Sequence, residues 1–187
     1  MPNLTLHHRE TDEDAVDTTP LHSDRMLRAL VVGAVALMIG LFGWTRWQGP
    51  VEHVDRPLPT LPVRLLEPVA DASVAGMPEV IHVWLPGCGA CAAEAAAYEV
   101  VRARYASQGV RFLSVSVVSD PAATRRAAAA YGLGGPLAST TGNLLEALQL
   151  DVVPSTVWIS KEGRVVSVGS GALSERVLDR ETRRILR

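Results

Sequence analysis

The stretch E-V-I-H-V-W-L-P-G-C-G-A-C, residues 79–91, decides the fold of this chain. It begins with a short β-branched run that is typical of a buried strand. It ends on Cys88 and Cys91, the only two cysteines in the sequence. The following residues, A-A-E-A-A-A-Y-E-V-V-R-A-R-Y-A, are strong helix formers. We therefore expect a strand that runs directly into a helix, with both cysteines at the junction.

This position gives the two cysteines a chemical role. Free amides and the macrodipole at a helix N-terminus favour the thiolate form of Cys88. Cys91 lies one helical turn later on the same face, within reach to close an internal disulfide. The spacing therefore predicts a single two-electron redox pair.

Metal binding and an inert structural role are the alternatives for the pair. A tetrahedral zinc site needs four ligands, and no cysteine or histidine follows Cys91. His7, His8 and His22 lie in a polar segment without apolar periodicity, where such residues are usually solvated. The sequence therefore predicts no metal and no other cofactor, while two inert core cysteines stay an alternative on the pair alone.

The remaining pattern predicts an α/β domain over residues 76–187. Further strands are expected at 110–118, 155–160 and 164–169, and further helices at 120–131, 143–150 and 173–186. The resulting order, β-α-β-α-α-β-β-α, implies a mixed central β-sheet flanked by helices on both faces.

The first 75 residues divide into three segments. Residues 1–24 carry six acidic residues and one arginine, so we expect a disordered acidic tail. In residues 25–47, the sixteen residues from Ala29 to Trp44 carry no charge and would make roughly 24 Å of helix. With the apolar residues that flank this stretch, we expect one transmembrane anchor. Residues 48–75 contain five prolines and are expected to form an extended tether.

A buried core helix or a cleaved signal peptide would be the alternatives to an anchor. The stretch W-T-R-W-Q-G-P offers no small-x-small cleavage site, which favours an uncleaved helix. Arg25 and Arg28 precede the span and Arg46 follows it, which favours a cytoplasmic N-terminus, although a wider count of arginines is balanced. The net charge of −2 gives no reason to expect a nucleic-acid partner.

Features in the domain together resemble the thioredoxin fold. Trp84 stands four residues before Cys88, and Glu94 follows Cys91 in a C-x-x-C-x-x-E pattern. Further on, D-V-V-P-S-T places a Val-Pro pair ahead of a strand, and W-I-S-K-E-G-R-V-V resembles the hairpin after it. Over residues 76–187 the chain is similar to the membrane-tethered TlpA-like thiol–disulfide oxidoreductases.

The resemblance implies a role for each part of the motif. Cys88 would attack a substrate disulfide and Cys91 would resolve the mixed disulfide. Pro154 would be cis beside the redox pair, and the backbone of Val153 could pair with an extended substrate strand. Without the resemblance, Pro154 reads as an ordinary strand-edge proline.

Two further residues are candidates for proton transfer. His82 lies six residues before Cys88, where thioredoxins often carry a buried acid, so we expect its imidazole to move the proton of Cys91. A core histidine satisfied by backbone is the alternative. Glu94 is either a general base or a solvated helix carboxylate. Gly87 departs from the family, which usually has Trp there, and Gly89-Ala90 replaces the usual Gly-Pro, so the direction of electron transfer cannot be borrowed.

The sequence thus predicts a membrane-tethered thiol–disulfide oxidoreductase that acts on extracytoplasmic protein partners, as a reductase supplied by an upstream thiol electron donor. We expect it in the bacterial cytoplasmic membrane, with the C-terminal domain facing the periplasm or cell exterior. A non-catalytic adaptor module is the first alternative. A thiol peroxidase is the second, although P-G-C-G-A-C lacks the hydroxyl residue that peroxidatic cysteines need.

Overall fold

The computed structural model describes residues 22–46, 49–67 and 76–187. Contacts divide the chain into two compact units, one ending at Phe42 and one beginning at Gly43. Residues 1–21 of the predicted acidic tail, with His7 and His8, lie outside the described residues.

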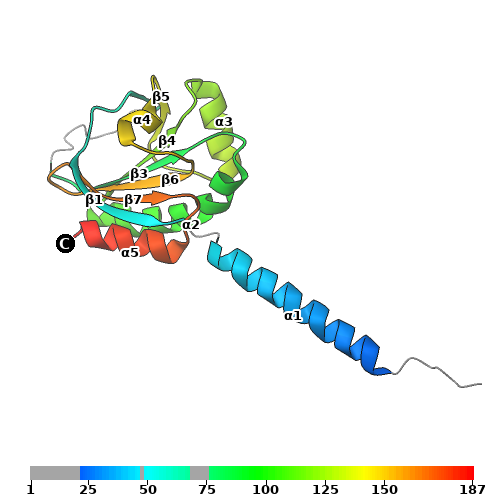
Figure 1. Ribbon diagram of the computed structural model, residues 1–187. Coiled ribbons are helices and arrows are strands. Elements are labelled where there is room, and N and C mark those ends of the chain that lie inside the picture. The colour runs from blue at the N-terminus through cyan, green and yellow to red at the C-terminus, as the bar shows by residue number, and fades with distance from the viewer. Residues whose placement is uncertain (1–21, 47–48, 68–75) are drawn as a thin grey trace, which may run out of the picture. The chain divides into compact units, whose positions relative to one another are not determined.

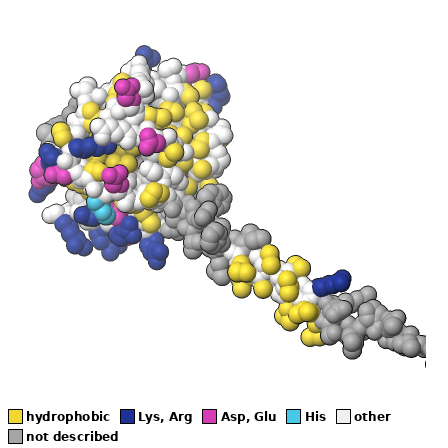
Figure 2. Space-filling model, viewed as in Figure 1, with side chains coloured by type: hydrophobic (Ala, Val, Ile, Leu, Met, Phe, Trp, Pro, Cys, Tyr) yellow, Lys and Arg dark blue, Asp and Glu magenta, His cyan; other side chains and the backbone are white. Residues whose placement is uncertain are grey.

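Helix α1 (His22–Arg46) begins in the first unit and makes up most of its described residues. Apolar side chains along residues 26–38 are exposed to solvent, among them Met26, Leu30 and Val32 (Figure 2). Among the helices that the structure describes, none combines the length and the apolar character needed to cross a membrane. The transmembrane anchor predicted over residues 25–47 is therefore not confirmed.

The second unit is built on a seven-stranded sheet in the order β1-β7-β6-β3-β4-β5-β2 (Figure 1). Its strands are β1 (Val51–Pro57), β2 (Val63–Leu65), β3 (Glu79–Trp84), β4 (Arg111–Ser116), β5 (Leu137–Thr140), β6 (Ser155–Ile159) and β7 (Arg164–Ser170). Strands β3, β4 and β5 are parallel, and the other pairings are antiparallel. The predicted mixed sheet is confirmed.

The extended tether predicted over residues 48–75 is wrong where β1 and β2 lie. Strand β1 pairs with β7 and strand β2 pairs with β5, so both belong to the sheet, at its opposite edges. The prolines fit because Pro57 ends an edge strand and the next two lie in the connection, where no ladder N–H is required. The domain therefore begins before residue 76, and residues 68–75 lie outside the described ranges.

The helices of this unit are α2 (Gly89–Tyr105), η1 (Ala106–Gln108), α3 (Pro121–Tyr131), α4 (Leu144–Leu148) and α5 (Glu175–Ile185). Their ends follow the predicted signals. The Asp120 carboxylate accepts hydrogen bonds from the amides of Ala122 and Ala123, and Gly132 ends α3 with φ of +72°.

Two hydrophobic clusters lie on opposite faces of the sheet. Alternation along β3 sends Val80 and Trp84 to one cluster and Ile81 and Val83 to the other. The first cluster is covered by α2, α3 and α5, and the second by α4 and apolar residues of the connection between β1 and β2. His82 points to the same face as Val80 and Trp84, so its imidazole enters the core beneath α2.

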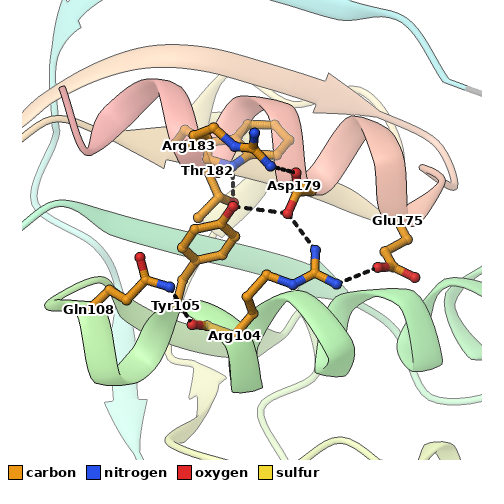
Figure 3. A network of polar contacts seen from close by, with 8 residues as sticks. Arg104, Tyr105, Gln108, Glu175, Asp179, Thr182 and Arg183 are labelled. Atoms are coloured by element: carbon orange, nitrogen blue, oxygen red, sulfur yellow. Dashed lines mark hydrogen bonds and ion pairs between the residues drawn. The ribbon is translucent and has the colours of Figure 1, made fainter.

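A polar network joins α2 to α5 at the edge of the first cluster (Figure 3). The Arg104 guanidinium and the Tyr105 hydroxyl both donate to the Asp179 carboxylate, and Arg104 also donates to Glu175. Burial acts to raise the pKa of Asp179, but the hydrogen bonds from Arg104 and Tyr105 outweigh it and hold this pKa below its ordinary value. The network fixes α5, and with it the loop before α5, against the helix that carries the cysteines.

Candidate redox site

The junction of β3 and α2 holds Cys88 at the helix N-terminus. Cys88 is the N-cap of α2, and its sulfur accepts a hydrogen bond of 3.1 Å from the amide of Cys91. The first turn of α2 carries no acidic residue. Gly87 has φ of +80°, a conformation that favours glycine, so a bulkier residue would be strained at this point in the turn. The local backbone therefore directs the Cys91 amide at the first sulfur.

Cys88 and Cys91 form a disulfide, with Cα atoms 5.2 Å apart. Cys88 is partly exposed, whereas Cys91 is completely buried in the first hydrophobic cluster beside Ala95. Because only one sulfur is open to solvent, an external thiol or disulfide can reach Cys88 and not Cys91.

The Val153–Pro154 peptide bond is cis, as the resemblance implies. Ser155 pairs with Val83 across β6 and β3, so Pro154 lies alongside the end of β3, next to the turn that leads to Cys88. Within the described residues, the backbone of Val153 makes no hydrogen bond to another backbone group. Its amide and carbonyl are therefore available to a further strand.

The structure brings His82 and Glu94 together. The His82 Nε2 atom lies 3.3 Å from the Glu94 Oε2 atom, and both side chains are fully buried. The sequence indicates the two residues as separate candidates and leaves open whether Glu94 is a solvated carboxylate. That alternative is wrong, because Glu94 is 2% exposed and its carboxylate pairs with a histidine in the core that contains Cys91.

Three groups that sequence reasoning missed complete this polar cluster. The Leu173 amide donates to the Glu94 Oε1 atom at 3.2 Å, and the Ser114 Oγ atom lies 3.5 Å from the His82 Nδ1 atom. The Tyr98 ring stacks on the imidazole with centroids 4.4 Å apart. For Ser114 the sequence did offer a signal, a serine within a buried strand, since a buried hydroxyl needs a polar neighbour.

The phenol of Tyr98 does not exchange a proton near neutral pH. Burial, and next the negative charge of Glu99, raise the pKa of Tyr98 far above its ordinary value. The phenol therefore stays protonated, and His82 and Glu94 are the groups of this cluster that can accept a proton.

Trp84 lies beneath the motif and not in contact with solvent. Its indole is completely buried, and Tyr131 packs against it edge-on with centroids 5.6 Å apart. The Tyr131 hydroxyl also donates to the Leu85 carbonyl at 3.5 Å. Trp84 therefore supports the turn before Cys88 by packing, and burial of a side chain of this size stabilises the fold by about 2 kcal/mol or more.

The fold and the paired cysteines define a thioredoxin-like protein with a C-x-x-C redox pair. Residues 60–184, more than half of the chain, match the family model described as Redoxin, and the chain belongs to this family.

Two curated relatives are thiol–disulfide oxidoreductases named ResA. The protein of Halalkalibacterium halodurans is 26% identical over 100 residues, covering 53% of this chain and 57% of the relative. The protein of Bacillus subtilis is 27% identical over 99 residues, covering 52% of this chain and 55% of the relative. The chain thus matches only about half the length of these relatives.

Solved structures share the fold. A thiol:disulfide interchange protein of Chlorobium tepidum has a TM-score of 0.59 at 23% identity, covering 71% of this chain and 98% of that protein. A DsbF homologue from Corynebacterium diphtheriae has a TM-score of 0.60 at 16% identity, covering 72% of this chain and 92% of the homologue. At these identities the likeness concerns the fold alone.

Proposed function

We propose that this protein is a membrane-tethered thiol–disulfide oxidoreductase that reduces disulfides in extracytoplasmic protein partners. The observation that carries the proposal is the disulfide between a partly exposed Cys88 at a helix N-terminus and a buried Cys91. Membership in the Redoxin family and the activity named for the ResA relatives support it.

The reaction begins with the reduced pair. The Cys88 thiolate attacks one sulfur of the substrate disulfide, a mixed disulfide forms, and the other substrate sulfur leaves as a thiolate. The Cys91 sulfur then attacks the Cys88 sulfur, which closes the internal disulfide and releases the second substrate thiolate. The substrate gains two electrons and the cysteine pair loses them, so an upstream thiol donor must reduce the pair before the next cycle.

The second step requires a proton acceptor inside the core. The Cys91 thiol is buried, so water cannot readily take its proton. The His82–Glu94 pair provides an imidazole and a carboxylate that share one hydrogen-bonding contact, and we assign it the role of accepting that proton. The free backbone groups of Val153 hold the substrate segment next to Cys88 by strand-like hydrogen bonds.

Attachment to a membrane is the part of the proposal that concerns α1. This assignment is supported by the exposed apolar side chains along residues 26–38, whose contact with water is unfavourable. We assign the protein to the bacterial cytoplasmic membrane, with the C-terminal domain facing the periplasm or cell exterior. Alkaline extraction of membranes that contain the full chain tests this assignment. Release of the chain into the supernatant would contradict it.

An exchange assay tests the chemistry independently of the membrane. Reduced full-length protein is mixed with an aromatic disulfide that releases a coloured thiolate. Two release phases are expected, one from attack by Cys88 and one from closure by Cys91. Cys91→Ser should show only the first phase, and Cys88→Ser should show neither. A Cys88→Ser protein with full biological activity would instead support the adaptor function.

A further inference from the structure

A buried row of polar side chains crosses three neighbouring strands on the face of the sheet that α2 covers. The strand register places Ser114 of β4 and Thr156 of β6 directly beside His82 of β3. All three residues are at most 1% exposed. The Ser114 hydroxyl contacts the imidazole, whereas the Thr156 hydroxyl is buried with no hydrogen-bond partner among the described residues. Of the two flanking hydroxyls, that of Ser114 can form a hydrogen bond with the imidazole and that of Thr156 does not.

We propose that Ser114 and Tyr98 are positioning residues for proton transfer from Cys91, because they hold the His82 imidazole against Glu94 in both of its protonation states. This inference rests on the proposed oxidoreductase function and adds to it the groups that let a buried imidazole gain and lose a proton.

Ser114 acts through the two-way character of its hydroxyl. An ionised carboxylate only accepts hydrogen bonds, so while Glu94 is ionised the Nε2 atom of His82 carries a hydrogen. In neutral His82 the Nδ1 atom is then an acceptor, and the Ser114 hydroxyl donates to it. When His82 accepts a proton, Nδ1 becomes a donor, and the same hydroxyl rotates to accept. Neither state leaves a buried ring nitrogen without a partner, which would otherwise cost free energy.

Tyr98 acts through its ring. The imidazole and the phenol ring stack with an interplanar angle of 26°, and Phe112 packs edge-on against Tyr98 with centroids 5.9 Å apart. The stacked ring fixes the imidazole plane and its face attracts a cationic imidazole. The Tyr98 hydroxyl is buried with no hydrogen-bond partner in the described part of the chain, so the ring and not the hydroxyl carries the role.

The groups around His82 come from every element packed against it. Helix α2, which also carries Cys91, contributes Glu94 and Tyr98. Strand β4 contributes Ser114 and strand β6 contributes Thr156. From the loop before α5, the Leu173 amide contacts Glu94 and not His82. The charged groups that act on Tyr98 are Glu99, Arg102, Glu79 and Glu94, of which Glu94 contacts His82. Among these groups, Glu94 is the carboxylate that contacts the imidazole, and Ser114 and Tyr98 hold the geometry of that contact.

The test uses the second, concentration-independent phase of the exchange assay on the full chain, measured from about pH 5 to about pH 9, the range in which imidazole titrates. Ser114→Ala is compared with Thr156→Val, which also removes one buried hydroxyl beside His82. We expect Ser114→Ala to slow this phase about fivefold at neutral pH, the loss of one buried hydrogen bond. The dependence of this phase on pH should also change in Ser114→Ala, because the His82 Nδ1 atom loses its hydrogen-bonding partner. Thr156→Val should leave both the rate and its pH dependence unchanged.

Rescue and spectroscopy separate positioning from packing. Ser114→Thr keeps the hydroxyl and should restore the pH dependence of the second phase. Tyr98→Phe keeps the ring and should match the unaltered protein, whereas Tyr98→Leu should slow the second phase. Nitrogen NMR of histidine-labelled protein should show the His82 signals change in Ser114→Ala and stay in Thr156→Val.

Two outcomes would overturn the inference. One is an equal response of Ser114→Ala and Thr156→Val. The other is an unaltered His82 spectrum in Ser114→Ala. If the unaltered protein shows no second phase, the result would instead contradict the proposed function itself.

Discussion

Two buried carboxylates lie on two helices that cover the first cluster, and they have different surroundings. Glu94 on α2 and Glu181 on α5 are each 2% exposed. Glu94 contacts a fully buried histidine, His82, and a backbone amide. Glu181 accepts hydrogen bonds from Ser167, from the exposed Arg180 and from His53, whose side chain is 46% exposed.

The difference lies in how each carboxylate is compensated. Burial acts to raise the pKa of Glu181, but the hydrogen bonds from Arg180, His53 and Ser167 outweigh it and hold this pKa below its ordinary value. Glu181 is therefore ionised near neutral pH and joins β1 to α5 through its contact with His53. The partners of Glu94 in the described structure, His82 and the Leu173 amide, both belong to buried residues, which supports the proposed exchange of a proton within the core. Burial alone does not make a carboxylate functional; the exposure of its partners distinguishes the two roles.

Glu94→Gln should give the largest effect. The amide keeps the size of the side chain but cannot accept a proton, so the phase assigned to Cys91 should slow about a hundredfold at neutral pH, the lower range for general acid–base catalysis. The first phase, attack by Cys88, should change little. Stopped-flow recording of thiolate release measures both phases in one experiment, and equal slowing of the two would remove the assigned role.

Gly49→Ala should disturb both carboxylate sites at once. A Cβ atom on Gly49 would lie 1.5 Å from the Ser170 carbonyl oxygen, at the loop that leads to Leu173 and at the start of β1. The Gly49 amide also donates to the Ala172 carbonyl. We expect a loss of about 2 kcal/mol in unfolding free energy by denaturant titration. Gly33→Ala is the control, since nothing lies within 4 Å of that position, and equal stability of the two variants would show that the close approach is absent.

Glu181→Gln should separate stability from activity. The amide replaces an acceptor of three hydrogen bonds, and we expect a loss of about 1–2 kcal/mol in unfolding free energy. Both phases of the exchange reaction should keep their rates. A slower Cys91 phase in Glu181→Gln, with an unchanged phase in Glu94→Gln, would reverse the assignment of the two carboxylates.

The pH dependence of stability should show the smallest effect. A folded-state pKa below the ordinary value stabilises the fold above that ordinary value, here 4.5 for Glu181, and the contribution is lost as the pH falls through the lowered pKa. The stability measured by thermal or denaturant unfolding should therefore fall more steeply below about pH 4.5 in the unaltered protein than in Glu181→Gln. Parallel curves for the two proteins would show that this carboxylate has the same pKa in the folded and unfolded chain.

Local patterns predicted most of the domain. The β-branched run before Cys88, the alanine-rich helix after it, and the Asp-Pro start and glycine end of α3 all specify their structure within a few residues. The edge strands were missed because they lie in a segment with several prolines. Strand β1 is mostly polar, β2 has only three residues, and both become strands by pairing with β7 and β5. Strand β5, with the sequence L-A-S-T, was missed because its four residues are too few to show a pattern.

The site was predicted residue by residue but not as an arrangement. Spacing located Cys88 and Cys91, and the family resemblance located Pro154, His82 and Glu94. The contact between His82 and Glu94 joins a strand to a helix, and the contact of His82 with Ser114 depends on the register of β3 against β4. Such contacts are set by packing in three dimensions, which a pattern along one segment does not specify.

The reduction potential of the Cys88–Cys91 pair tests the central claim most directly. The full chain in detergent, equilibrated against dithiothreitol or glutathione buffers, gives this value from the fraction of protein that holds the disulfide. A reversible couple at or below about −250 mV is the predicted result, in the range of a reductase. A value near −120 mV would make the protein an oxidant, and the absence of any reversible bridge would contradict the enzymatic account altogether.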